Sequence, residues 1–151
     1  MKDLRGIYPA LPTPMAADGC IDLRALKALV DFVIGQGVDG LYVGGSTAES
    51  FLLTEDERRS IAETVLTHAA GRVKVIVHTG AGGTDAAVRL SKHARTNGAD
   101  AISSVPPIYF KYTTDEVIAY YLELIDKSDM PLVVYNIPAF TGINMTQGRS
   151  E

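Results

Sequence analysis

A repeat of short apolar runs about 30 residues apart is the feature that most limits the fold of this chain. Five such runs, rich in β-branched and aromatic residues, begin at residues 6, 40, 73, 101 and 132. Runs this short, with little polar alternation, are typical of strands in a parallel sheet that is buried on both faces. The predicted strands are 6–11, 40–44, 73–78, 101–105 and 132–136.

Helical patterns fill the intervals between the predicted strands. In the first, leucines and valines at helical spacing follow Asp22, the expected N-cap, and end before Gly37. The second and fourth helices each open with a capping box, a threonine followed three residues later by a glutamate. These pairs are Thr54 with Glu57 and Thr113 with Glu116. A third helix is expected from residue 84 to residue 97.

Strands that alternate with helices of this length predict an α/β fold with a parallel sheet. Two architectures remain, an open doubly wound sheet and a closed (β/α)8 TIM barrel. No G-x-G-x-x-G fingerprint follows the first strand, which weakens the dinucleotide-binding open sheet. Barrel enzymes carry their chemistry in the loops after the strands. Polar residues follow the second and fifth strands here, which favours the barrel.

A complete barrel of this kind takes about 250 residues. We therefore expect residues 1–151 to be the amino-terminal part of a single barrel domain, with about five strands and four helices. The closing residues 146–151 show no apolar periodicity where a fifth helix should begin. The expectation is a chain truncated before the sixth strand.

The composition excludes several classes of partner. A net charge of −4, a pI near 5.3 and the lack of a basic stripe argue against nucleic acid. No apolar stretch reaches the ~18 residues of a membrane span. Cys20 is the only cysteine, so an internal disulfide is excluded and a cytoplasmic location is expected. The three histidines have no metal-ligand spacing, so no metal is expected.

Polar groups at the predicted strand ends are the candidate site. Two glycines precede Ser46 and Thr47, whose hydroxyls beside free amides suit a small carboxylate, although a turn that caps the next segment is an equal alternative. Tyr135 could shuttle a proton or simply pack in the core. Tyr109 lies in a proline-rich loop that could be a lid, a subunit contact or packing. His78 ends a strand, where a structural hydrogen bond is favoured over a role in a site.

Three segments resemble the pyruvate-dependent class I aldolases that include N-acetylneuraminate lyase and dihydrodipicolinate synthase. They are residues 40–49 (GLYVGGSTAE), residues 133–138 (VVYNIP) and the opening strand in residues 6–14 (GIYPALPTP). The similarity runs from about residue 4 to about residue 146, in the family's order and spacing. Residues 139–142 (AFTG) lack the arginine with which the synthases grip a second carboxylate, so the chain is more similar to the lyases.

The resemblance implies a (β/α)8 barrel, a homotetramer that needs no cofactor, and a lysine that forms a Schiff base with pyruvate. A lyase of this family cleaves sialic acid to pyruvate and N-acetylmannosamine. By resemblance, Ser46 and Thr47 bind the pyruvate carboxylate, Tyr135 shuttles a proton, and Tyr109 reaches a neighbouring subunit's site. The small-molecule substrates would be pyruvate and an amino sugar.

Two positions depart from the family pattern. The family has glycine where this chain has Ala48, and alanine would cost about 1 kcal/mol if the position needs a positive φ. The Schiff-base lysine belongs to the sixth strand, and no lysine here matches it: Lys92 and Lys127 fall in helices and Lys111 in a loop. The chain alone is thus expected to be inactive.

Two other hypotheses stay open. One keeps an aldolase but changes its substrate, to that of dihydrodipicolinate synthase or of a related 2-keto-3-deoxy sugar-acid aldolase. The other is a non-catalytic half-barrel that associates with another chain, because a sheet cut after its fifth strand exposes unpaired edges.

Overall fold

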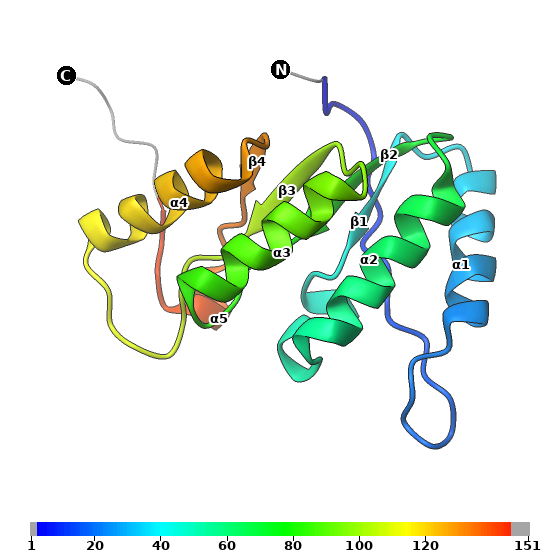
Figure 1. Cartoon of the computed structure of the whole chain (residues 1–151), viewed down its shortest axis with the longest axis horizontal. Coiled ribbons are helices and arrows are strands. Elements are labelled where there is room, and N and C mark those ends of the chain that lie inside the picture. Colours follow the sequence, from blue (N-terminus) through cyan, green and yellow to red (C-terminus); the bar gives the residue numbers. More distant parts are fainter. Residues whose placement is uncertain (1–2, 146–151) are drawn as a thin grey trace.

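The computed structural model describes residues 3–145, which form one parallel sheet with a layer of helices on one of its faces (Figure 1). The sheet has the strand order β1-β2-β3-β4. The strands are β1 (Gly40–Val43), β2 (Lys74–His78), β3 (Ala101–Ser104) and β4 (Leu132–Val134). The helices are α1 (Leu23–Gly35), α2 (Glu55–Ala69), α3 (Thr84–Thr96), α4 (Thr114–Ser128) and the short α5 (Pro138–Thr141). Two 3₁₀ turns, η1 (Ser46–Ala48) and η2 (Ser50–Leu52), follow β1.

Every strand pairs in parallel with the next strand along the chain, and a helix connects each pair. Helices α1 to α4 lie side by side in chain order (Figure 1). This is the succession of βα units that a barrel requires, with α1 to α4 outside and one sheet face left for the interior. The prediction of an α/β fold that matches part of a (β/α)8 barrel is confirmed.

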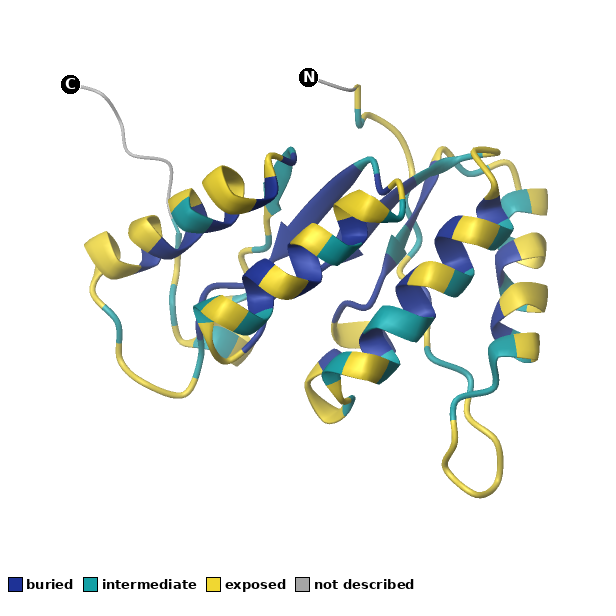
Figure 2. Ribbon diagram, in the orientation of Figure 1, coloured by how far each residue is buried: buried dark blue, intermediate teal, exposed yellow. Residues whose placement is uncertain are grey.

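The core lies between the sheet and the helix layer, as the buried surfaces in Figure 2 show. Leu41 and Val43 of β1 pack there with Leu26 and Val30 of α1, and all four are almost completely buried. Because side chains alternate along a strand, the residues between them point to the opposite face. We call that helix-free side of the sheet the inner face, and Tyr42 lies on it.

The first predicted strand, residues 6–11, is not a strand of the sheet, so the prediction of five strands is one too many for the described residues. The segment lies beside β1 through a single bridge between Ala10 and Tyr42. Leu11 N–H donates to the Tyr42 carbonyl at 2.9 Å, and Gly40 N–H donates to the Ile7 carbonyl at 3.2 Å. Pro9 has no N–H to donate back, so a second bridge cannot form.

The predicted helix ends agree with the structure because their signals are local. The Asp22 carboxylate accepts from Ala25 N–H, and both capping boxes are present. Helix α5 and the two 3₁₀ turns were not predicted. The expectation for residues 146–151 lies outside the described residues. Ala48 falls in η1, and the positive φ of that region is at Glu49 (58°), so the strain considered for Ala48 does not occur.

Candidate active site

The loop after β1 places two hydroxyl side chains at the carboxyl edge of the sheet. Ser46 and Thr47 are exposed and begin η1, whose N-cap, Gly45, contributes no side-chain hydrogen bond. The first amides of such a turn have no partner within it, so they are available to an external acceptor. Thr13 Oγ1 donates to the Ala48 carbonyl at 2.9 Å and fastens the end of the turn. Two hydroxyls and two free amides can together bind a carboxylate.

Tyr135 follows β4 and lies half-buried between two other rings of the inner face. Its ring stands edge-on to Tyr42, with ring centroids 6.0 Å apart, and edge-on to His78 at 6.1 Å. Tyr42 also contacts Gly45, because a Cβ added to that glycine would lie 2.4 Å from Cε1 of the Tyr42 ring. One ring thus contacts both the turn that carries Ser46 and the tyrosine that ends β4.

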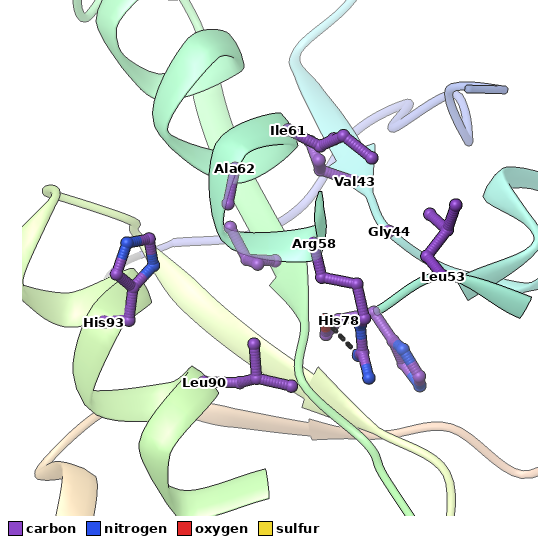
Figure 3. Close-up of a pocket in the computed structure, with 10 residues that line it drawn as sticks. Val43, Gly44, Leu53, Arg58, Ile61, Ala62, His78, Leu90 and His93 are labelled. Atoms are coloured by element: carbon purple, nitrogen blue, oxygen red, sulfur yellow. Dashed lines mark hydrogen bonds between the residues drawn. The ribbon is translucent and has the colours of Figure 1, made fainter. Parts of the chain in front are cut away.

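His78 ends β2 and is a buried neutral base. Burial, with the nearby positive charge of Arg58, lowers its pKa to about 3, and the backbone of Gly44 partly offsets this. Its Nε2 accepts from Val105 N–H at 3.3 Å, which is the structural hydrogen bond that the sequence favoured. Its own carbonyl accepts from Arg58 Nη2 at 3.1 Å (Figure 3). His78 therefore connects the end of β2 to the loop after β3 and to α2 by hydrogen bonds, and its ring carries no charge at neutral pH.

An open cleft of about 470 Å³ lies over this edge of the sheet. Its walls come from the loops after β1, β3 and β4, and they are mainly apolar. The lining residues are Ser46, Glu49, Ser50, Phe51, Leu52, Val105, Ile108, Ile137, Phe140 and Thr141. Glu49 is the only ionisable side chain among these described residues.

A family model described as the dihydrodipicolinate synthetase family matches residues 3–149, nearly the whole chain. The chain belongs to this family. It is 49% identical over 138 residues to an N-acetylneuraminate lyase of Rhizobium meliloti, and the aligned residues make up 91% of this chain and 46% of that protein. It is 43% identical over 146 residues to an N-acetylneuraminate lyase of Citrobacter koseri, and the aligned residues make up 96% of this chain and 49% of that protein. The chain therefore spans about half the length of the curated relatives it matches.

Solved structures of similar proteins have the same arrangement of strands and helices. CdNal from Clostridium difficile, in complex with mannosamine, superposes with a TM-score of 0.94 at 38% identity, over 96% of this chain and 50% of that one. A prophage protein of the dihydrodipicolinic acid synthase family from E. coli K12, in complex with pyruvate, superposes with a TM-score of 0.92 at 37% identity. The superposition covers 95% of this chain and 48% of that one. The fold is thus that of the first half of a family barrel.

The predicted site residues of this family member do not all gather at one place. Ser46 lines the cleft, and Tyr42 connects its turn to Tyr135. Tyr109 is 93% exposed, has a φ of 85°, and contacts the ring of Phe110 with centroids 5.0 Å apart. It projects from the loop after β3, and most of its side chain is open to solvent. Its placement is that of a side chain available to another molecule.

Tyr42 and Ser103 are members of the site region that the sequence interpretation missed. Tyr42 hydroxyl donates to Ser103 Oγ at 2.9 Å, although the two residues are 61 positions apart. The available signal was a pair of serines, Ser103 and Ser104, in a buried strand, since a buried hydroxyl needs a partner. Its partner follows from strand register, which the sequence does not give.

Within residues 3–145 no group of three or more histidine, cysteine, aspartate or glutamate side chains could hold a metal ion. No helix in that part of the chain is both long and apolar enough to cross a membrane.

Proposed function

We propose that this chain supplies the amino-terminal half of a class I aldolase that cleaves sialic acid, N-acetylneuraminate, to pyruvate and N-acetylmannosamine. The relatives named above as N-acetylneuraminate lyases are 43–49% identical to it. The observation that carries the proposal is the ring of Tyr42, which contacts both the Ser46–Thr47 turn and Tyr135. This contact supports one site that binds a carboxylate at one end and moves a proton at the other.

Ser46 and Thr47 hold the carboxylate of the pyruvate portion through their hydroxyls and amides, which requires no charged side chain. A lysine forms a Schiff base with the ketone carbon and releases water, and the protonated imine then takes up the electron pair when the carbon–carbon bond breaks. The sugar hydroxyl beside that bond loses its proton as the aldehyde forms. Tyr135, half-buried just after β4, accepts this proton at its phenol oxygen while its own phenol proton passes on to the carbon freed by the broken bond, and the same transfer runs in reverse in the condensation direction.

The lysine is the group that, in this proposal, the chain does not supply. Three described lysines lie away from the strand ends. Lys92 and Lys127 are exposed on helices α3 and α4, and Lys111 is exposed in the loop before α4. None lies at the carboxyl end of a strand. We therefore propose that the nucleophile comes from a sixth strand outside these 151 residues, and that this polypeptide alone is inactive.

The cleft favours a lyase over dihydrodipicolinate synthase. The arginine with which the synthases grip a second carboxylate has no counterpart among the described lining side chains, which include the acidic Glu49 and no basic group. An uncharged sugar suits these walls better. A related 2-keto-3-deoxy sugar-acid aldolase must also bind the carboxylate of pyruvate. A comparison of substrates is therefore needed to distinguish such an aldolase from the lyase.

The function is tested by joining residues 1–145 to the carboxyl-terminal half of the Rhizobium meliloti relative, a construction we call the completed barrel. Pyruvate release from sialic acid, from 2-keto-3-deoxy sugar acids, and pyruvate consumption with aspartate semialdehyde are measured side by side. The expected result is activity with sialic acid, abolished by replacing the lysine of the added half. Preference for aspartate semialdehyde or for a 2-keto-3-deoxy sugar acid would reject the lyase assignment.

A second candidate, a non-catalytic half-barrel that associates with another chain, is favoured by a different observation. Ile118, Leu122 and Ile125 form an exposed apolar stripe on α4, on the side where a further βα unit would pack. Val134 of β4 is also 43% exposed. Assembly as a homotetramer, with Tyr109 reaching a neighbouring subunit, and a cytoplasmic location belong to the proposal for the completed protein.

A further inference from the structure

Tyr42 is held at its hydroxyl by a line of hydrogen bonds that crosses the inner face of the sheet. The hydroxyl donates to Ser103 Oγ at 2.9 Å, and Ser103 Oγ in turn donates to the Val133 carbonyl at 3.0 Å. These residues belong to β1, β3 and β4, so the line links β1 to β3 across β2 and then continues to the neighbouring strand β4. Val133 lies two residues before Tyr135, and the line therefore ends on the segment that carries the proposed proton shuttle.

Burial raises the pKa of Tyr42 to about 12, although the bond to Ser103 opposes this shift. The hydroxyl is thus protonated throughout the neutral range, and it is a hydrogen-bond donor rather than a base. Since its proton is already committed to Ser103, Tyr42 is unsuited to exchange protons with a substrate. Any contribution of Tyr42 to the reaction must therefore come from the positions in which it keeps neighbouring residues.

The ring of Tyr42 is fixed as firmly as its hydroxyl. One edge packs against Gly45, where any side chain would collide with the ring. Tyr135 lies edge-on to it with an interplanar angle of 86°, and His78 completes the group at 6.5 Å. Edge-to-face packing of aromatic rings is directional, so a shift of Tyr42 would shift Tyr135 as well.

We propose that Tyr42 is a positioning residue that sets the place of Tyr135 relative to the Ser46–Thr47 turn, through its ring and its hydrogen bond to Ser103. The inference rests on the proposed function, because it assigns the distance between the carboxylate-binding turn and the proton shuttle to a third side chain. Proton transfer depends steeply on such distances, whereas binding of the carboxylate by the turn itself does not involve Tyr135.

The test uses Tyr42→Phe and Ser103→Ala in the completed barrel. Each removes the hydroxyl bond while the ring of residue 42 remains. Both variants should lower kcat about tenfold and leave KM for pyruvate, measured in the condensation direction, within about twofold of the parent. The matched control is Ser128→Ala, which also removes a buried hydroxyl, the one that donates to the Leu124 carbonyl at 2.6 Å near the carboxyl end of α4.

Loss of stability alone would affect the control and the two test variants alike, so equal kcat values in all three would overturn the proposal. A rise in KM with unchanged kcat would also overturn it, because the effect would then lie in carboxylate binding. Combining Tyr42→Phe with Tyr135→Phe gives a further check. If Tyr42 acts through Tyr135, the double variant should be no slower than Tyr135→Phe.

A spectroscopic measurement on the 151-residue chain separates this inference from the proposed function. The chain is labelled with 3-fluorotyrosine, and its Tyr135 resonance is assigned by Tyr135→Phe. Tyr42→Phe should shift or broaden that resonance, and Ser128→Ala should leave it in place. An unmoved resonance rejects the positioning role. A moved resonance, together with a completed barrel that lacks lyase activity, supports the positioning role and rejects the proposed function.

Discussion

The Nε2 atom of His78 accepts a hydrogen bond from the backbone N–H of Val105 at 3.3 Å, which ties the end of β2 to the loop after β3. An imidazole nitrogen can accept only in the neutral ring. Burial lowers the pKa of His78 to about 3 from an ordinary value of 6.5, so the folded chain keeps the ring neutral far into the acid range.

This predicts a loss of stability with falling pH. Between pH 6.5 and pH 3 the unfolded chain binds a proton at His78 and the folded chain does not, so the free energy of unfolding decreases as pH falls. The slope from this one group is at most about 1.4 kcal/mol per pH unit. Urea unfolding at pH 7.5 and pH 5 should show a larger decrease for the parent than for His78→Gln. Equal decreases would contradict the assignment.

Arg58 stabilises the same region from the helix side. Its Nη2 donates to the His78 carbonyl at 3.1 Å, and burial lowers its pKa to about 10, which still leaves the guanidinium charged at neutral pH. Arg58→Ala removes a charged donor to a buried carbonyl and should lower the free energy of unfolding by about 1.5–3 kcal/mol. Arg24→Ala, on the exposed side of α1, should change it by less than about 0.5 kcal/mol in the same urea titration.

The turn that carries Ser46 and Thr47 allows a paired prediction of opposite signs. Ala48 is buried with an ordinary helical-turn φ, while Glu49 is exposed with a φ of 58°. Ala48→Gly should therefore destabilise the chain by about 0.5–1 kcal/mol, and Glu49→Gly should stabilise it by a similar amount. Thermal unfolding of the two variants measures the difference. A stabilising Ala48→Gly would show that the positive φ belongs to residue 48.

Features set by neighbours in the sequence could be predicted, and features set by strand register could not. The capping boxes at Thr54 and Thr113 involve a threonine and a glutamate three residues apart, and the structure has both. The parallel order of the strands also followed from the βα repeat. The first strand was predicted wrongly because its apolar pattern was counted without the missing N–H of Pro9.

The candidate site also has one part that local sequence could predict and another part that depends on strand register. Ser46, Thr47 and Tyr135 stand at strand ends, which the sequence could locate, although their roles remain proposals. The hydrogen bond between Tyr42 and Ser103 depends on the register of three strands, so no local pattern indicates it. The cleft wall at Phe140 comes from α5, a helix too short to have a periodic signal.

The apolar stripe on α4 predicts association of the isolated chain. Ile118, Leu122 and Ile125 are 44–60% exposed on one side of the helix, and such surfaces bind other molecules. Sedimentation of the 151-residue chain should show concentration-dependent association, reduced by Leu122→Lys. Ala28→Lys adds the same charge on an exposed position of α1 and should have no such effect. A parent that stays monomeric at all concentrations would reject a role for the stripe.

We expect this polypeptide alone to form no Schiff base, because the proposed nucleophile lies outside these 151 residues. Schiff-base formation needs an amine at the carboxyl edge of the sheet, close to the carboxylate held by Ser46 and Thr47, and the described lysines lie on helices, in an outer loop or at the amino end of β2. Incubation with pyruvate and borohydride should leave the 151-residue chain without a pyruvate-derived mass increase. The completed barrel should gain one adduct, on the lysine of its added half. An adduct on Lys92, Lys111 or Lys127 of the isolated chain would show that the chemistry does not need a sixth strand.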